Sequence, residues 1–144
     1  MKTYYVNTKK ILPQIEREIS RVAASAYSDN GTPLYDAIIP YSRDEVVLKE
    51  MIEDALSAML TRLSDIATMT SGLFEFDIPE ERTHDITTIG KAIDRFVVMN
   101  VCSPWMIQKH PIKAEEFGAR STDALEKVEK RRWKWLKRIH IILY

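Results

Sequence analysis

The stretch that decides the fold is residues 42–69, SRDEVVLKEMIEDALSAMLTRLSDIATM. Along it an apolar residue recurs at every third or fourth position: Leu48, Ile52, Leu56, Met59, Leu63 and Ile66. This spacing puts them on one stripe of an α-helix. Ser42 and Glu45 have the spacing of a capping box, which predicts that the helix begins here. No Gly or Pro interrupts it before Gly72, so we expect a helix roughly 40 Å long whose stripe needs partners to cover it.

Three other segments have helical spacing and are expected to pack around this central helix. Residues 8–27 carry a stripe formed by Leu12, Ile15, Ile19, Val22 and Ala26. Residues 85–110 are apolar on all sides near Phe96 to Cys102, which indicates burial on more than one side. Pro104 predicts a kink or a restart within that helix. With a fourth helix at 111–138, the pattern predicts an all-α, antiparallel four-helix-bundle-like domain.

A short extended segment interrupts the helices at residues 72–79. Phe74, Phe76 and Ile78 alternate with acidic residues, which is typical of a half-buried strand around 73–78. A strand needs a partner for its backbone groups. The N-terminal arm (1–7), the C-terminal tail (139–144) and a strand of another subunit all remain candidates.

Residues 32–41, TPLYDAIIPY, are irregular but rich in apolar side chains. One interpretation is a loop folded over the core. The other is a contact between subunits, because exposed apolar patches mark interfaces. The candidate contact residues in this segment are Leu34, Tyr35, Ile38, Ile39 and Tyr41.

The composition is that of an ordinary globular chain and predicts one domain over residues 1–144. Lys+Arg and Asp+Glu balance at 21 each, so no overall charge favours nucleic acid or membrane. No apolar run reaches the length of a membrane span, and the N-terminus lacks a signal-peptide core. Cys102 is the single cysteine, so no intrachain disulfide can form.

Charge is nevertheless segregated along the chain. Acidic residues dominate 75–85, whereas residues 127–138 are strongly basic and contain Trp133 and Trp135. The basic segment has three interpretations: a solvated helix face, a contact with an acidic protein, or a contact with nucleic acid. Opposite charges on one neutral chain favour head-to-tail association. The basic candidates for the interface are Lys130, Arg131, Arg132, Lys134, Lys137 and Arg138.

No motif for catalysis stands out in the sequence. His84, His110 and His140 are far apart and share no metal-ligand spacing. Cys102 lies in an apolar stretch that does not lower the pKa of a thiol. The Glu-x-x-His pairs of di-iron bundles and a phosphate-binding glycine loop are both missing. We therefore expect no catalytic, cofactor or metal site, no small-molecule substrate and no membrane partner.

The layout resembles the head–tail connector (head-completion) proteins of tailed phages and prophages. The resemblance rests on Asp44 opening a helix with Leu48, Ile52 and Ala55, and on an extended segment that ends in Pro79. It continues with Ile89, Ala92 and Ile93 leading to Trp105. It covers roughly residues 42–138 and includes no catalytic motif.

This resemblance implies a small helical subunit, in the virion or the host cytoplasm, that assembles into a ring between portal and tail. Portal or tail proteins would be its partners, with DNA nearby. Phe74 and Phe76 join the candidate interface residues named above. The alternative function is a small helical regulatory or nucleic-acid-binding protein that uses the basic segment 127–138.

Overall fold

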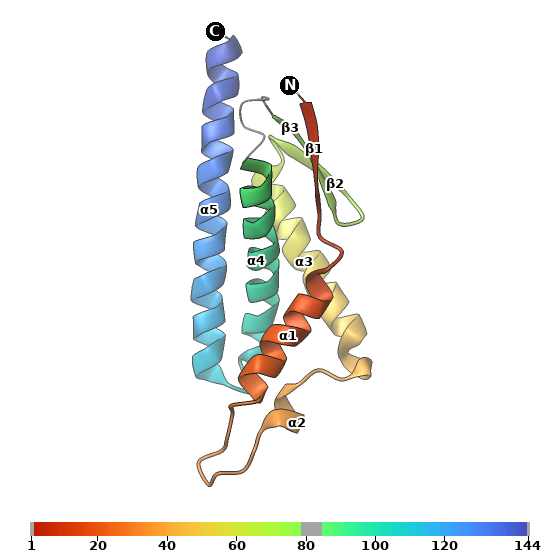
Figure 1. Ribbon diagram of the computed structural model, residues 1–144, viewed down its shortest axis with the longest axis vertical. Helices are drawn as coiled ribbons and strands as arrows, with labels where there is room; N and C mark the ends of the chain where they lie inside the picture. The colour runs from red at the N-terminus through yellow and green to blue at the C-terminus, as the bar shows by residue number, and fades with distance from the viewer. Residues whose placement is uncertain (1, 79–84, 144) are drawn as a thin grey trace.

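The computed structural model describes residues 2–78 and 85–143 (Figure 1). A 3-10 turn at Ser42–Asp44 precedes the third helix. The elements are β1 (Lys2–Asn7), α1 (Ile11–Ala23), α2 (Tyr35–Ile38), α3 (Glu45–Leu63), β2 (Ala67–Thr70), β3 (Leu73–Ile78), α4 (Asp85–Met106) and α5 (Pro111–Leu143). The described part of the chain is thus mostly helical, with four long helices and a small antiparallel sheet.

Helix α4 is the centre of the helical layer. It packs along α5 and also contacts α1, α3 and β1 (Figure 1). Its buried side chains surround the helix axis, as the all-round apolar pattern of this segment predicted. The expectation that the 42–69 helix is central was wrong, because α3 carries one apolar stripe, whereas α4 contacts α1, α3 and α5 and is buried all round near Phe96 to Cys102. Pro104 lies in the last turn of α4 and does not divide the helix.

The sheet has the strand order β1-β3-β2, and both pairings are antiparallel. Phe76 of β3 is paired with Tyr4 on one side and with Ala67 on the other. Of the partners considered for this strand, the N-terminal arm was correct. The C-terminal tail was not, because residues 139–143 continue α5 as a helix. Tyr144 lies outside the described residues.

Strand β2 replaces the last part of the predicted 42–69 helix. Helix α3 ends at Leu63, and the chain then forms a hairpin whose two turn residues, Ser71 and Gly72, both have positive φ (48° and 79°). Such a turn matches the twist of two antiparallel strands. The backbone N–H of Thr8 donates to the carbonyl of Gly72 at 2.9 Å, which ties the hairpin to the start of α1.

Several helix ends also differ from the sequence-based boundaries. The capping box of Ser42 and Glu45 does not form; instead Asp44 Oδ2 accepts a hydrogen bond from the backbone N–H of Tyr41 at 2.8 Å. Helix α1 is shorter than 8–27, since residues 24–34 form a loop in which Tyr27 bridges to Pro33. Helix α4 ends before residue 110 and α5 runs past residue 138.

Candidate functional site

Most of the exposed large apolar side chains lie toward one end of the molecule (Figure 1). The structure describes nine large hydrophobic residues that are exposed, and only Tyr5 and Trp133 lie elsewhere. The other seven come from the loop after α1, from α2, from the segment that leads into the first turn of α3, and from the connection between α4 and α5 (Figure 1). We call this set the apolar end; it comprises Tyr27, Tyr35, Tyr41, Val46, Val47, Ile107 and Ile112.

The apolar end contains part of the interface predicted at 32–41. Tyr35 and Tyr41 are exposed there, but Ile38 is buried in the core, so its assignment to an interface was wrong. Leu34 and Ile39 are half-buried and pack against the core. The indole N–H of Trp105 donates to the carbonyl of Ile38 at 2.8 Å and fixes α2 against α4. The segment is therefore both a cover for the core and a source of exposed tyrosines.

Sequence reasoning missed five members of the apolar end. Val46 and Ile112 are the most exposed of these, at 66% and 69%. Val46 and Val47 come before Leu48, where the apolar stripe of α3 begins, and do not lie on that stripe. Two valines outside the stripe were a signal of exposure that the sequence did contain. Ile107 and Ile112 flank the α4–α5 connection, and their common position becomes clear only once α4 and α5 pack side by side.

Phe74 and Phe76, also predicted at an interface, are fully buried. Their ring centroids lie 6.1 Å apart in a stacked arrangement beneath the sheet. Both therefore belong to the core of the subunit, and neither offers a surface to a partner. The alternation that predicted the strand was correct, whereas the inferred interface was not.

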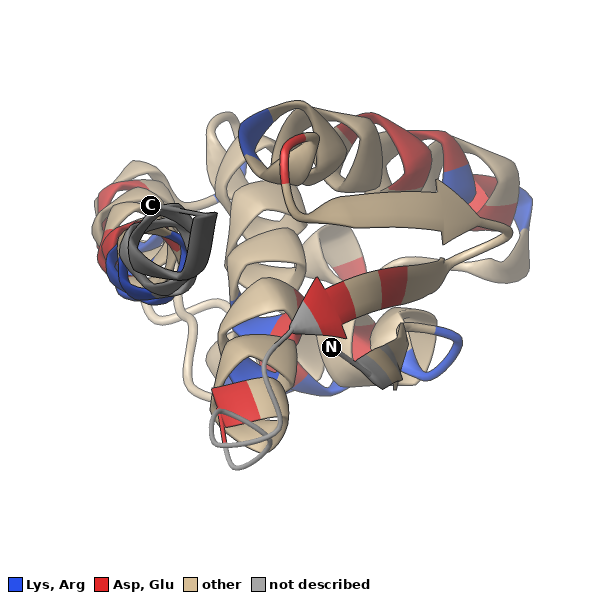
Figure 2. Ribbon diagram, turned by 90° about the horizontal axis from the view of Figure 1, so that it is seen from above, with Lys and Arg blue, Asp and Glu red and all other residues tan. Residues whose placement is uncertain are grey.

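The basic part of α5 is tied to the body of the chain by ion pairs. Figure 2 shows basic residues on α5 and acidic residues on β3. Arg131 Nη1 lies 2.6 Å from Oδ1 of Asp85, whose side chain is fully buried. Arg132 donates two hydrogen bonds to the carboxylate of Asp65, at 2.7 and 3.1 Å. Arg131 and Arg132 are thus each paired with an acidic residue of the same chain, which corrects the expectation that these charges face another subunit.

The remaining basic candidates divide into two groups. Lys130 and Lys134 are exposed on α5. The side chains of Lys137 and Arg138 lie outside the described residues, although their backbone belongs to α5. Of the acidic segment 75–85, residues 79–84 also lie outside the described part.

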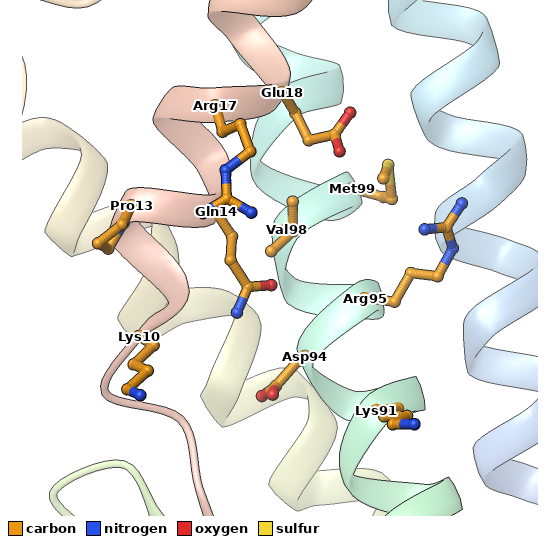
Figure 3. A pocket seen from close by; sticks show the side chains of 10 residues that line it. All are labelled: Lys10, Pro13, Gln14, Arg17, Glu18, Lys91, Asp94, Arg95, Val98 and Met99. Carbon is orange, nitrogen blue, oxygen red and sulfur yellow. The ribbon is translucent and has the colours of Figure 1, made fainter.

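A groove of about 700 Å³ runs between α1 and α4 (Figure 3). Asp94 of α4 extends toward α1 in this groove, where Lys10, Gln14 and Arg17 lie, whereas Arg95 points toward α5 (Figure 3). Oδ1 of Asp94 is buried and has no hydrogen-bond partner. Burial raises the pKa of this carboxyl group to about 6. Sequence reasoning did not single out Asp94, although it is an acid within a run of apolar residues.

Cys102 is buried in α4, and burial raises the pKa of its thiol to about 12. The thiolate that a nucleophile requires is therefore strongly disfavoured at this position. Within residues 2–78 and 85–143, no three His, Cys, Asp or Glu side chains come together as a possible metal site. No helix in the described part is both long and apolar enough to cross a membrane.

Comparison of the chain with protein-family models, with curated proteins and with solved structures finds no match. The candidate functional features of the described chain are the apolar end, the ion-paired part of α5 and the α1–α4 groove.

Proposed function

We propose that this chain is a non-enzymatic structural subunit of a phage or prophage particle, of the head–tail connector type. It would act by binding portal or tail proteins and by associating with copies of itself into a ring. The fold we propose for the assembled subunit is four-helix-bundle-like. The sequence pattern of residues 42–138 supports the particle type, and the apolar end supports a protein contact.

The apolar end is the observation that carries this proposal. Proteins that stay monomeric rarely gather large apolar side chains on one surface, and such gatherings mark sites of protein contact. Tyrosines are well suited to such contacts, because each ring offers a large apolar area and a polar hydroxyl group. Tyr41 is already ordered, since its hydroxyl group donates to the carbonyl of Asp36 at 2.7 Å. Ordering a side chain before binding lowers the entropic cost of association.

The charges now available for the contact are fewer than the sequence suggested. Arg131 and Arg132 are engaged with Asp85 and Asp65 inside the chain. The affinity must therefore come mainly from apolar area, because exposed charges attract weakly at physiological salt. The same ion pairs reduce the support for the alternative, nucleic-acid binding by residues 127–138, for which Lys127, Lys130 and Lys134 are the exposed cations in the described part.

Two measurements test the proposal. The first is the identity of the neighbouring genes: portal, terminase and tail genes are expected beside this one. The second is sedimentation velocity of the full chain, alone and mixed with the portal and tail proteins encoded nearby. We expect a ring-sized species or a stable complex with one of those proteins.

A pair of double variants locates the contact surface. Val46→Glu with Ile112→Glu places two charges on the apolar end and is expected to abolish the complex. Tyr5→Glu with Trp133→Glu makes the same number of changes on exposed apolar residues elsewhere and is expected to preserve it. Circular dichroism and thermal unfolding confirm that both variants fold. If both folded variants assemble as well as the parent chain, the apolar end is not the contact surface.

A further inference from the structure

The α1–α4 groove contains a polar atom that the chain itself leaves unmatched. Buried polar groups in proteins are nearly always hydrogen-bonded, so an exception requires an explanation. Oδ1 of Asp94 is such an exception. An ionised carboxylate only accepts hydrogen bonds, so the missing partner is a donor, an O–H or N–H group from outside the chain.

Cations line the same groove as this carboxylate without neutralising it. Lys10, Arg17 and Lys91 line the groove, and none takes part in the ion pairs between described residues. Unpaired cations in a concave site raise the local concentration of anions. They also disfavour a cationic occupant, which leaves neutral hydroxyl or amide groups as donors for Asp94. The groove therefore combines an acceptor for a neutral donor with a binding region for an anion.

We propose that the α1–α4 groove binds a small phosphorylated compound that carries free hydroxyl groups, such as a sugar phosphate or a ribonucleotide. The hydroxyl groups donate to Asp94, and the phosphate lies against Arg17, with Lys10 adding positive charge farther along the groove (Figure 3). Hydrogen bonds between a hydroxyl group and a carboxylate are short and strong, and a planar guanidinium suits phosphate oxygens. Carboxylates bind ribose hydroxyls in this way in dinucleotide sites.

The size and lining of the groove agree with such a ligand. Its volume of about 700 Å³ falls within the usual range for small-molecule sites, roughly 300 to 1,000 Å³. Val98 and Met99 add apolar surface to the lining, and Gln14 adds a neutral amide between Arg17 and Asp94 (Figure 3). None of the residues that line this groove belongs to the apolar end. The proposed ligand and the proposed protein contact can therefore be tested, and refuted, independently of each other.

Isothermal titration calorimetry of the full chain tests the proposal with three probes: ribose 5-phosphate, ADP and inorganic phosphate. We expect ribose 5-phosphate or ADP to bind at one site, and about tenfold more tightly than inorganic phosphate. Tighter binding of ADP assigns a nucleotide ligand, and equal or tighter binding of ribose 5-phosphate assigns a sugar phosphate. If neither organic probe binds more tightly than inorganic phosphate, the proposal is overturned. Water would then be the hydrogen-bond donor to Asp94.

Variants separate the two halves of the site. Asp94→Ala should lower the affinity for the organic probe to that for inorganic phosphate. Arg17→Gln should weaken the binding of the organic probe and of inorganic phosphate alike, by about tenfold. Lys127→Gln, which removes an exposed cation of α5, is the matched control and should change neither. Asp94→Asn provides a second, nearly isosteric variant if the alanine form unfolds. An equal loss in the Lys127 variant would show that binding is non-specific and would overturn the proposal.

Discussion

We expect the Asp94→Asn variant to gain stability over the parent chain, and to gain more at neutral pH than at acid pH. Burial raises the pKa of this carboxyl group from 3.8 to about 6, so the folded chain holds the proton more tightly than the unfolded chain. Below about pH 4 the group is protonated in both states and costs nothing. As the pH rises from about 4 to 6, the unfolded chain loses its proton first. The free energy of unfolding therefore falls over this range and stays reduced above it.

The size of the effect follows from the pKa difference. A difference of about 2 units corresponds to about 3 kcal/mol, the upper limit for this group. The carboxyl group lies in an open groove and is only partly buried, so solvent screens much of this cost. We therefore expect the difference in unfolding free energy between the Asn variant and the parent chain to be about 1 kcal/mol larger at neutral pH than at acid pH.

Urea unfolding of both proteins at about pH 4 and about pH 8, in buffers without phosphate, measures this gain. Asp54→Asn removes an exposed carboxyl group of α3 and serves as the control. If the difference in unfolding free energy between parent and Asp94→Asn is the same at both pH values, the carboxylate is not desolvated in the folded state. The reasoning about the groove would then fail with it.

Other substitutions test the packing and the ion pairs. Leu56→Ala should cost about 2–5 kcal/mol in chemical denaturation, because Leu56 is buried; a loss below about 0.5 kcal/mol would contradict its placement. Asp85→Ala should cost about 3–5 kcal/mol by breaking a buried pair with Arg131, and a double-mutant cycle should show strong coupling; independent effects would contradict the pairing. Gly72→Ala should cost at least about 1 kcal/mol, because φ is positive and the new Cβ would lie 2.9 Å from Thr8 Oγ1; an unchanged melting temperature would contradict this turn.

The sequence predicted the helices well because their apolar periodicity is strong. Leu48, Leu56, Met59 and Leu63 are all buried, as the stripe of residues 42–69 required. The same periodicity extended the helix too far. Ile66 fits the stripe and is buried, but the chain has already left the helix there to form β2.

The signal for β2 was local and was outweighed by the helical pattern. Thr68 and Thr70 are β-branched residues that favour strands, and Ser71-Gly72 is a two-residue turn sequence. The functional features depend on tertiary packing instead. The groove at Asp94 exists only because α1 lies across α4, and no periodicity within either helix predicts that arrangement.

The order of the strands has a consequence for synthesis. Strand β1 leaves the ribosome first, but its partner β3 follows much later, since Lys2 pairs with Ile78. At usual rates of translation, roughly 5–20 residues per second, β1 waits several seconds for its place in the sheet. Once β3 has been made, and until β1 of the same chain pairs with it, the β2–β3 hairpin exposes a free edge of β3 that the β1 segment of another chain can occupy equally well. Dilution during refolding should therefore favour the correct monomer, because exchange of β1 between chains requires two molecules to meet.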